Sequence, residues 1–249
     1  MSKFIVVTGG NGFIGSHLHE RLSGLGHNVI EFDNQIEKPV SSITLKLLEE
    51  ERIGYVIHLA ATADVRRSIK YPNEYWQNNV MESKRLFDIC YGEDIPVLYA
   101  SSSCAKHWYL SPYGTTKKAM EAFAYPGQIG MRFTTVYGPG SRPRMLISRL
   151  KEGNIDYMTN HTRDFIHVYD VCKAIIKIME KGDKPIYDVC TGEGWNIKEL
   201  CHMAGWEGLE ESVGDKCEVL DNVSNPRHLK ELGWTPEESL LDYLEIQPN

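Results

Sequence analysis

The stretch SPYGTTKK, residues 111–118, places a tyrosine and a lysine four positions apart. On a helix, Tyr113 and Lys117 would lie on one face and reach one site. An unperturbed tyrosine loses its proton only near pH ~10, so it is a poor base at neutral pH. A nearby ammonium group favours the phenolate and lowers the pKa of the tyrosine. The pair therefore predicts a tyrosine that carries protons to and from a substrate.

Three serines end the apolar run PVLYASSS, residues 96–103, shortly before this pair. Parallel α/β sheets bind ligands at the carboxyl ends of their strands. A hydroxyl from Ser101, Ser102 or Ser103 could hold a substrate oxygen there. Taken alone, a tyrosine and a lysine at this spacing are more often surface residues. The serines, together with a cofactor loop upstream, favour the chemical interpretation.

The cofactor loop is GGNGFIG, residues 9–15, which follows an apolar run and opens a helical pattern. Its glycines satisfy two spacings, GxGxxG from Gly10 and GxxGxxG from Gly9, and both include Gly12 and Gly15. Glycine lets the backbone turn tightly and approach a pyrophosphate at a helix N-terminus. Asp33 ends the next apolar run, at the distance expected for a carboxylate that binds the adenine ribose. This carboxylate would repel a 2′-phosphate, so the loop predicts NAD rather than NADP.

Apolar runs rich in β-branched residues alternate with helical patterns along the first half of the chain. We expect strands at 4–8, 28–32, 55–60, 96–101 and 130–136, and helices at 15–26, 44–52, 75–92, 114–124 and 168–180, the last with Asp170 as its N-cap. The alternation predicts an α/β fold, a Rossmann-type doubly wound parallel sheet with a small C-terminal substrate-binding lobe. We expect residues 1–140 to form the NAD-binding domain, with 163–191 returning to it. Residues 141–162 and 192–249 would form the small lobe.

Composition excludes several classes of function. The net charge of −7 argues against binding nucleic acid, which needs a basic face. No apolar run is long enough to cross a membrane, and a cytoplasmic location is expected. The six cysteines show no CxxC spacing, so we expect buried thiols and no metal site.

These motifs resemble the extended short-chain dehydrogenase/reductase family, specifically its NAD-dependent nucleotide-sugar epimerase/dehydratase group, which includes UDP-glucose 4-epimerases. The matching stretches occur in the family's order and include TGGNGFIGSHL (8–18), HLAA (58–61), SPYGTTK (111–117), RFTTVYGPG (132–140) and RDFIHVYDV (163–171). The resemblance implies that Ser103, Tyr113 and Lys117 are the catalytic residues. It implies an NAD site formed by Gly9, Gly12, Phe13, Ile14, Gly15, Asp33, Asn34, Leu59, Ala60, Ala61, Asn79, Tyr113 and Lys117.

For the substrate, the resemblance implies contacts from Ser103, Tyr113, Thr135, Arg163 and Lys216. Arg163 would meet the pyrophosphate of a nucleotide sugar. Lys216 would replace an arginine that grips the nucleotide phosphates, and Thr135 stands where the family usually has asparagine. The resemblance also implies a homodimer.

The resemblance further implies which reaction to expect. Dehydratases of the family carry an acidic pair directly after the catalytic hydroxyl residue, whereas this chain has Cys104 and Ala105. This favours an NAD-dependent epimerase that inverts C4 of a UDP-hexose through a transient 4-keto intermediate. The alternatives are a 4,6-dehydratase, a reductase, a 3,5-epimerase/reductase, or a noncatalytic NAD-binding scaffold.

Overall fold

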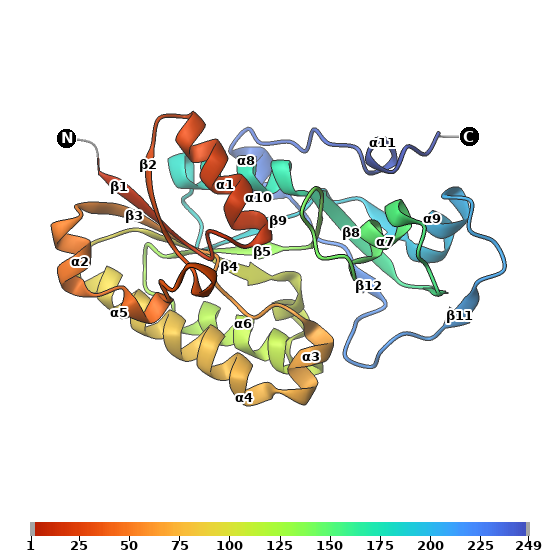
Figure 1. The fold of residues 1–249 in the computed structure, drawn as a ribbon, viewed down its shortest axis with the longest axis horizontal. Helices are drawn as coiled ribbons and strands as arrows, with labels where there is room; N and C mark the ends of the chain where they lie inside the picture. The colour runs from red at the N-terminus through yellow and green to blue at the C-terminus, as the bar shows by residue number, and fades with distance from the viewer. Residues whose placement is uncertain (1–2, 248–249) are drawn as a thin grey trace.

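A six-stranded parallel sheet forms the centre of the larger lobe in the computed structural model, which describes residues 3–247. The strand order β2-β1-β3-β4-β5-β9 places later strands on both sides of β1 (Figure 1). All neighbouring pairs are parallel. The strands are β1 (Phe4–Thr8), β2 (Asn28–Phe32), β3 (Ile53–His58), β4 (Val97–Ser102), β5 (Ile129–Phe133) and β9 (Ile186–Val189). The predicted Rossmann-type α/β fold is therefore confirmed.

Helices cover both faces of this sheet (Figure 1). On one face α1 (Phe13–Gly24) packs beside α8 (Val168–Lys181), and their apolar sides share a core with the strands. On the other face α2 (Leu45–Glu50), α5 (Glu82–Gly92) and α6 (Pro112–Phe123) cover a second core. Because burial of apolar side chains drives folding, both faces stabilise the sheet. Between residues 3 and 247, no helix is both long and apolar enough to span a membrane.

The apolar run at 130–136 was expected to form one strand, but the structure divides it between two sheets. β5 ends at Phe133, and β6 (Thr135–Tyr137) pairs in parallel with β8 (Thr162–His167) of the second sheet. The second sheet also contains β10 (Gly194–Asn196) and β12 (Asp221–Asn222). Buried Thr134 lies at the switch, where its hydroxyl donates to Asp164 at 3.3 Å. This contact joins residues 30 positions apart, so the periodicity of apolar residues cannot predict it.

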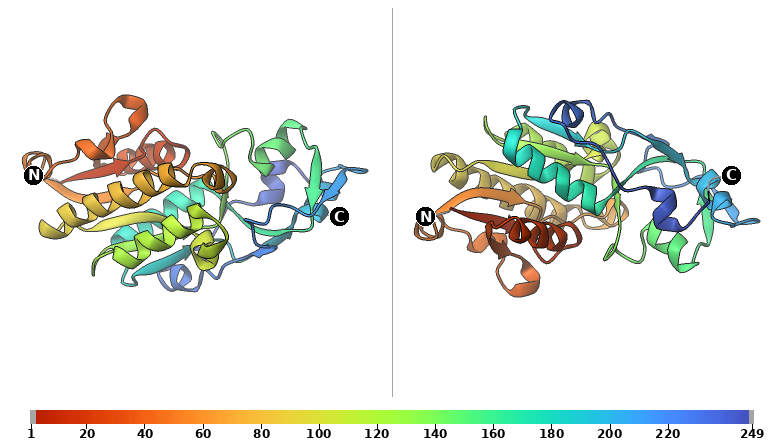
Figure 2. Two further views of the ribbon diagram at one scale, coloured as in Figure 1. Left: turned by 90° about the horizontal axis from the view of Figure 1, so that it is seen from below. Right: turned by 90° about the horizontal axis from the view of Figure 1, so that it is seen from above.

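The smaller lobe lies beyond the carboxyl ends of the six parallel strands (Figure 2). It has its own apolar core, to which the second sheet and several short elements contribute. These elements are α7 (Leu146–Glu152), β7 (Tyr157–Thr159), α9 (Ile197–Met203) and α11 (Leu240–Leu244), and β11 (Glu210–Ser212) pairs with β7 at the edge of the lobe. The proposed division of the chain into lobes stays a prediction. We place α10 (Arg227–Glu231) and Trp234 with the larger lobe, although residues 192–249 were expected in the smaller one. The reason is that Leu229 and Trp234 pack into the core of the larger lobe.

Asp170 has a different role from the one expected of it. His167 is the N-cap of α8, and Asp170 lies in the first turn, fully buried. Its Oδ2 accepts hydrogen bonds from the backbone N–H groups of Glu237 and Glu238. A buried carboxylate needs such donors. Asp170 therefore fastens the C-terminal segment to α8 instead of capping the helix.

Candidate active site

Tyr113 and Lys117 lie in the first turns of α6, at the carboxyl end of the parallel sheet. The helix starts sharply because the Ser111 side chain accepts a hydrogen bond from the N–H of Gly114, and Pro112 occupies the first turn. The Lys117 Nζ lies 5.9 Å from the centre of the Tyr113 ring. The same nitrogen donates to the carbonyl of Ala100 on β4 at 2.7 Å. The structure thus brings the predicted pair together.

Burial controls the protonation of both groups. Lys117 is only 2% exposed, and burial lowers its pKa to about 7. Burial raises the pKa of Tyr113, whereas a hydrogen bond with Ser102 and the positive charge of Arg142 act to lower it. The expected lowering of the tyrosine pKa is therefore not supplied by the surroundings that the chain itself provides. A positive charge from a bound ligand would have to supply it.

Replacing Lys117 with methionine is expected to flatten the dependence of stability on pH. The pKa of Lys117 is about 7 when folded and 10.5 ordinarily. Between these values the unfolded chain binds a proton that the folded chain does not, so the free energy of unfolding rises with pH across this window, by at most about 1.4 kcal/mol per pH unit. Below the window both states are protonated and the full cost of burying the ammonium group is present. Urea unfolding at several pH values across the window measures this slope.

Lys118→Met is the matched control, because the neighbouring Lys118 side chain is 47% exposed. We expect this variant to keep the wild-type slope. Equal slopes for wild type and Lys117→Met would show that Lys117 stays charged in the folded protein.

The three serines at the carboxyl end of β4 have three different neighbours. Ser101 donates to the Glu121 carboxylate at 2.7 Å. The Ser102 hydroxyl accepts a hydrogen bond from the backbone N–H of Cys104 at 3.2 Å and lies near enough to Tyr113 to act on the pKa of its hydroxyl. The Ser103 hydroxyl accepts a hydrogen bond from the Asn222 side chain at 3.0 Å. The structure thus adds Ser102 as a candidate that the sequence could not select, because adjacent serines carry no distinguishing signal. The assignment of Ser103 stays a prediction.

The glycine loop forms a cradle at the start of α1. Gly9 has φ of +71°, and a Cβ there would lie 2.8 Å from the backbone nitrogen of Ala60. A Cβ on Gly15 would lie 2.0 Å from the Gly9 carbonyl oxygen. Gly12 precedes the helix and offers no side-chain cap, so the N–H groups of the first turn, which includes Phe13 and Ile14, remain open to an anion. The residues present fit the pyrophosphate of a dinucleotide.

Asp33 lies beside this cradle, at the end of β2. Its Oδ2 accepts from the backbone N–H of Asn11 at 3.1 Å, and its Oδ1 accepts from the N–H of Gln35 at 2.9 Å. These bonds hold the carboxylate next to the glycine loop, where an adenine ribose is expected. Asn34 follows on the surface. The arrangement supports the predicted NAD site.

The loop after β3 packs against Gly9 and forms a wall of the glycine cradle, and Leu59, Ala60 and Ala61 are half-buried in this loop. Buried Asn79 holds the loop from the π-helix at Trp76–Met81. Its Oδ1 accepts from the N–H of Thr62 at 2.8 Å, and its Nδ2 donates to the Thr62 carbonyl at 3.0 Å. In this structure Asn79 therefore positions the wall of the site. Its predicted contact with the cofactor stays a prediction.

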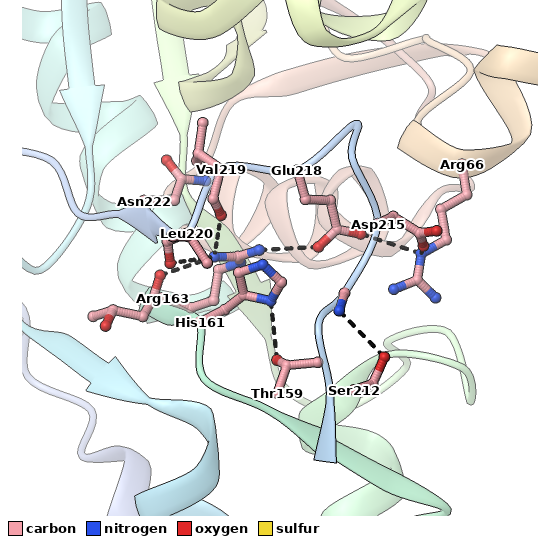
Figure 3. Close-up of polar contacts among 12 residues, drawn as sticks. Arg66, Thr159, His161, Arg163, Ser212, Asp215, Glu218, Val219, Leu220 and Asn222 are labelled. Atoms are coloured by element: carbon pink, nitrogen blue, oxygen red, sulfur yellow. Dashed lines mark hydrogen bonds and ion pairs between the residues drawn. The ribbon is translucent and has the colours of Figure 1, made fainter.

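The other three predicted substrate residues lie on the second sheet or on the loop that leads to it. Arg163, on β8, is 9% exposed and donates to the Glu218 carboxylate at 2.9 Å (Figure 3). Thr135 is half-buried on β6, and Lys216 is exposed on the loop after β11. Two acids near Lys216 in the sequence form ion pairs with arginines: Asp215 with Arg66, and Glu218 with Arg163. Sequence spacing missed Glu218 and Arg66, since they come from distant parts of the chain.

Comparison with known proteins identifies the family. The sequence model of the NAD dependent epimerase/dehydratase family matches residues 5–190. A UDP-glucose 4-epimerase of Corynebacterium glutamicum is 26% identical over 300 aligned residues, which cover 94% of this chain and 91% of that protein. The chain therefore belongs to the NAD-dependent epimerase/dehydratase family, and its glycine cradle fits that cofactor.

Solved structures agree with this assignment. MoeE5, in complex with UDP-glucose and NAD, is 30% identical with a TM-score of 0.85, and the match covers 98% of this chain and 97% of that one. The UDP-glucose 4-epimerase of Thermotoga maritima, with UDP-glucose, is 26% identical with a TM-score of 0.81, covering 97% and 96%. These similarities confirm the predicted nucleotide-sugar epimerase group and its Rossmann fold.

Proposed function

We propose that this protein is an NAD-dependent nucleotide-sugar 4-epimerase that acts on a UDP-hexose. The observation that carries the proposal is the pairing of Tyr113 with buried Lys117, in a chain whose glycine cradle fits NAD. Cys104 and Ala105 follow the serines, so no carboxylate stands there to expel a 6-hydroxyl. Such a site is equipped to move one proton, which is what oxidation and reduction at a single carbon require.

In this mechanism Tyr113, as phenolate, takes the proton of the C4 hydroxyl. It returns the proton after the 4-keto sugar has turned its other face toward the cofactor site, so that reduction inverts C4. The serine hydroxyls donate hydrogen bonds to the reacting oxygen and hold it in place. Lys117, whose Nζ lies 5.9 Å from the centre of the Tyr113 ring, would add its positive charge to that of bound NAD, and the two charges together would favour the phenolate. NAD, when bound in the cradle, supplies a hydride acceptor and donor at C4. Because the hydrogen returns to the sugar, the cofactor is not consumed.

Proton NMR in deuterated water, with UDP-glucose, UDP-glucuronic acid and GDP- and dTDP-sugars, tests this proposal. UDP-glucose and UDP-glucuronic acid are included because MoeE5 has been solved with both. The expected result is a new C4 epimer without deuterium on its carbons. Deuterium at C3, C5 or C6 would instead indicate 3,5-epimerase or dehydratase chemistry. No change with any sugar, even with NAD added, would favour the noncatalytic scaffold.

A further inference from the structure

One carboxylate in the smaller lobe connects two arginines that come from distant parts of the chain. The Glu218 carboxylate lies 2.9 Å from Arg163 Nη2 and 3.1 Å from Arg66 Nε (Figure 3). Arg163 belongs to β8, whereas Arg66 belongs to α3 (Val65–Lys70) of the larger lobe. Asp215 pairs with Arg66 as well. Two guanidinium groups therefore converge on an acid that the protein itself provides.

The loop that carries this acid, residues 213–220 between β11 and β12, is held against the site by further contacts. The Arg163 Nη1 donates to the carbonyls of Val219 at 2.9 Å and Leu220 at 3.3 Å. Gly214 packs on the imidazole of His161, so closely that a Cβ on Gly214 would lie 2.0 Å from the ring. We call residues 213–220 the latch loop. Its position depends on Arg163, the residue expected to meet the substrate's pyrophosphate.

The two arginines provide the positive charge and the hydrogen-bond donors that bind a diphosphate. Guanidinium groups bind phosphate and carboxylate with the same forked donor geometry. Glu218 offers one negative charge shared between two arginines, whereas a diphosphate offers at least two charges and more acceptor oxygens. A diphosphate can therefore replace Glu218 and bind both arginines with more charge and more acceptor oxygens than the single carboxylate offers.

We propose that Glu218 is an internal competitor that occupies Arg163 and Arg66 in the free protein, and that a nucleoside diphosphate group binds by displacing it. The inference rests on the proposed function in one respect, namely that the substrate carries a diphosphate. Displacement lowers the apparent affinity, since only the fraction of molecules with free arginines can bind. Competition by Glu218 therefore raises the substrate concentration that is needed to occupy the two arginines.

Glu218→Gln tests this competition, with UDP as the probe and isothermal titration of the full-length protein as the measurement. We expect Glu218→Gln to bind UDP about three- to tenfold more tightly than wild type, because the neutral amide competes less well for guanidinium groups. Glu211→Gln is the matched control. It removes the same charge from neighbouring β11, where Glu211 pairs only with Lys198 among the contacts described, and its UDP affinity should equal that of wild type.

A second readout follows the loop without any ligand. Hydrogen exchange of the backbone amides of residues 213–220 should be faster in Glu218→Gln than in wild type and Glu211→Gln. Unchanged or weaker UDP binding by Glu218→Gln would overturn the proposal, because Glu218 would then support the ligand or leave it unaffected. Failure of all three proteins to bind UDP would also overturn it.

The NMR assay with nucleotide sugars judges the proposed function separately. Turnover by wild type, without tighter UDP binding by Glu218→Gln, would overturn the competition alone. UDP binding without turnover of any sugar would contradict the epimerase, while the comparison of affinities would still decide the role of Glu218.

Discussion

Tyr113→Phe is expected to lower kcat by roughly 10²–10⁴-fold, the usual contribution of a positioned general acid–base group. The variant keeps the ring, which packs edge-on against Tyr75, and loses only the hydroxyl that would exchange a proton with the substrate. Lys117 remains bonded to the Ala100 carbonyl, so the helix and the cofactor cradle should persist. We therefore expect NAD to bind as in wild type. Turnover is measured by NMR and NAD binding by titration.

Tyr109→Phe is the matched control for this experiment. Tyr109 lies four residues before Tyr113, on the 3-10 helix that precedes α6, and it is 67% exposed, so loss of its hydroxyl should leave kcat unchanged. Near-normal turnover by Tyr113→Phe would disprove the proposed proton transfer. Loss of NAD binding by this variant would show that the hydroxyl supports the cofactor site rather than the chemistry alone.

Gly15→Ala is expected to weaken NAD binding by more than tenfold and to lower the free energy of unfolding by about 1–3 kcal/mol. The added Cβ would lie 2.0 Å from the Gly9 carbonyl oxygen and 2.8 Å from the Gly10 Cα. These are backbone atoms of the loop that would hold the pyrophosphate, so they can yield only if the loop moves. Urea unfolding and NAD titration measure the two effects.

Gly24→Ala provides the control in the same helix. Nothing lies within 4 Å of a Cβ at Gly24, and alanine is the better helix former, so we expect unchanged NAD binding and a gain of up to about 1 kcal/mol in stability. If Gly15→Ala bound NAD as tightly as wild type, the cradle would not be the cofactor site.

Local spacing predicted much of the larger lobe. The glycines of residues 9–15 and the pair Tyr113 and Lys117 depend on one turn or one helix, whose geometry is set within a few residues. The structure differs from the sequence-based expectation at one strand and at the start of one helix. The run at 130–136 switches sheets at Thr134, and His167 rather than Asp170 caps α8. Thr134 bonds Asp164, 30 positions away, and Asp170 bonds the backbone of Glu237 and Glu238, so distant residues engage both side chains.

By itself, the sequence of this protein determined the type of fold, the NAD cradle and the tyrosine–lysine pair, because short-range backbone geometry encodes them. Only the tertiary structure showed that Ser102 reaches Tyr113 and that Glu218 holds two arginines. Glu218 is 55 positions from Arg163 and 152 from Arg66. No periodicity spans such distances, since the meeting of these charges depends on how the smaller lobe packs over the carboxyl ends of the sheet.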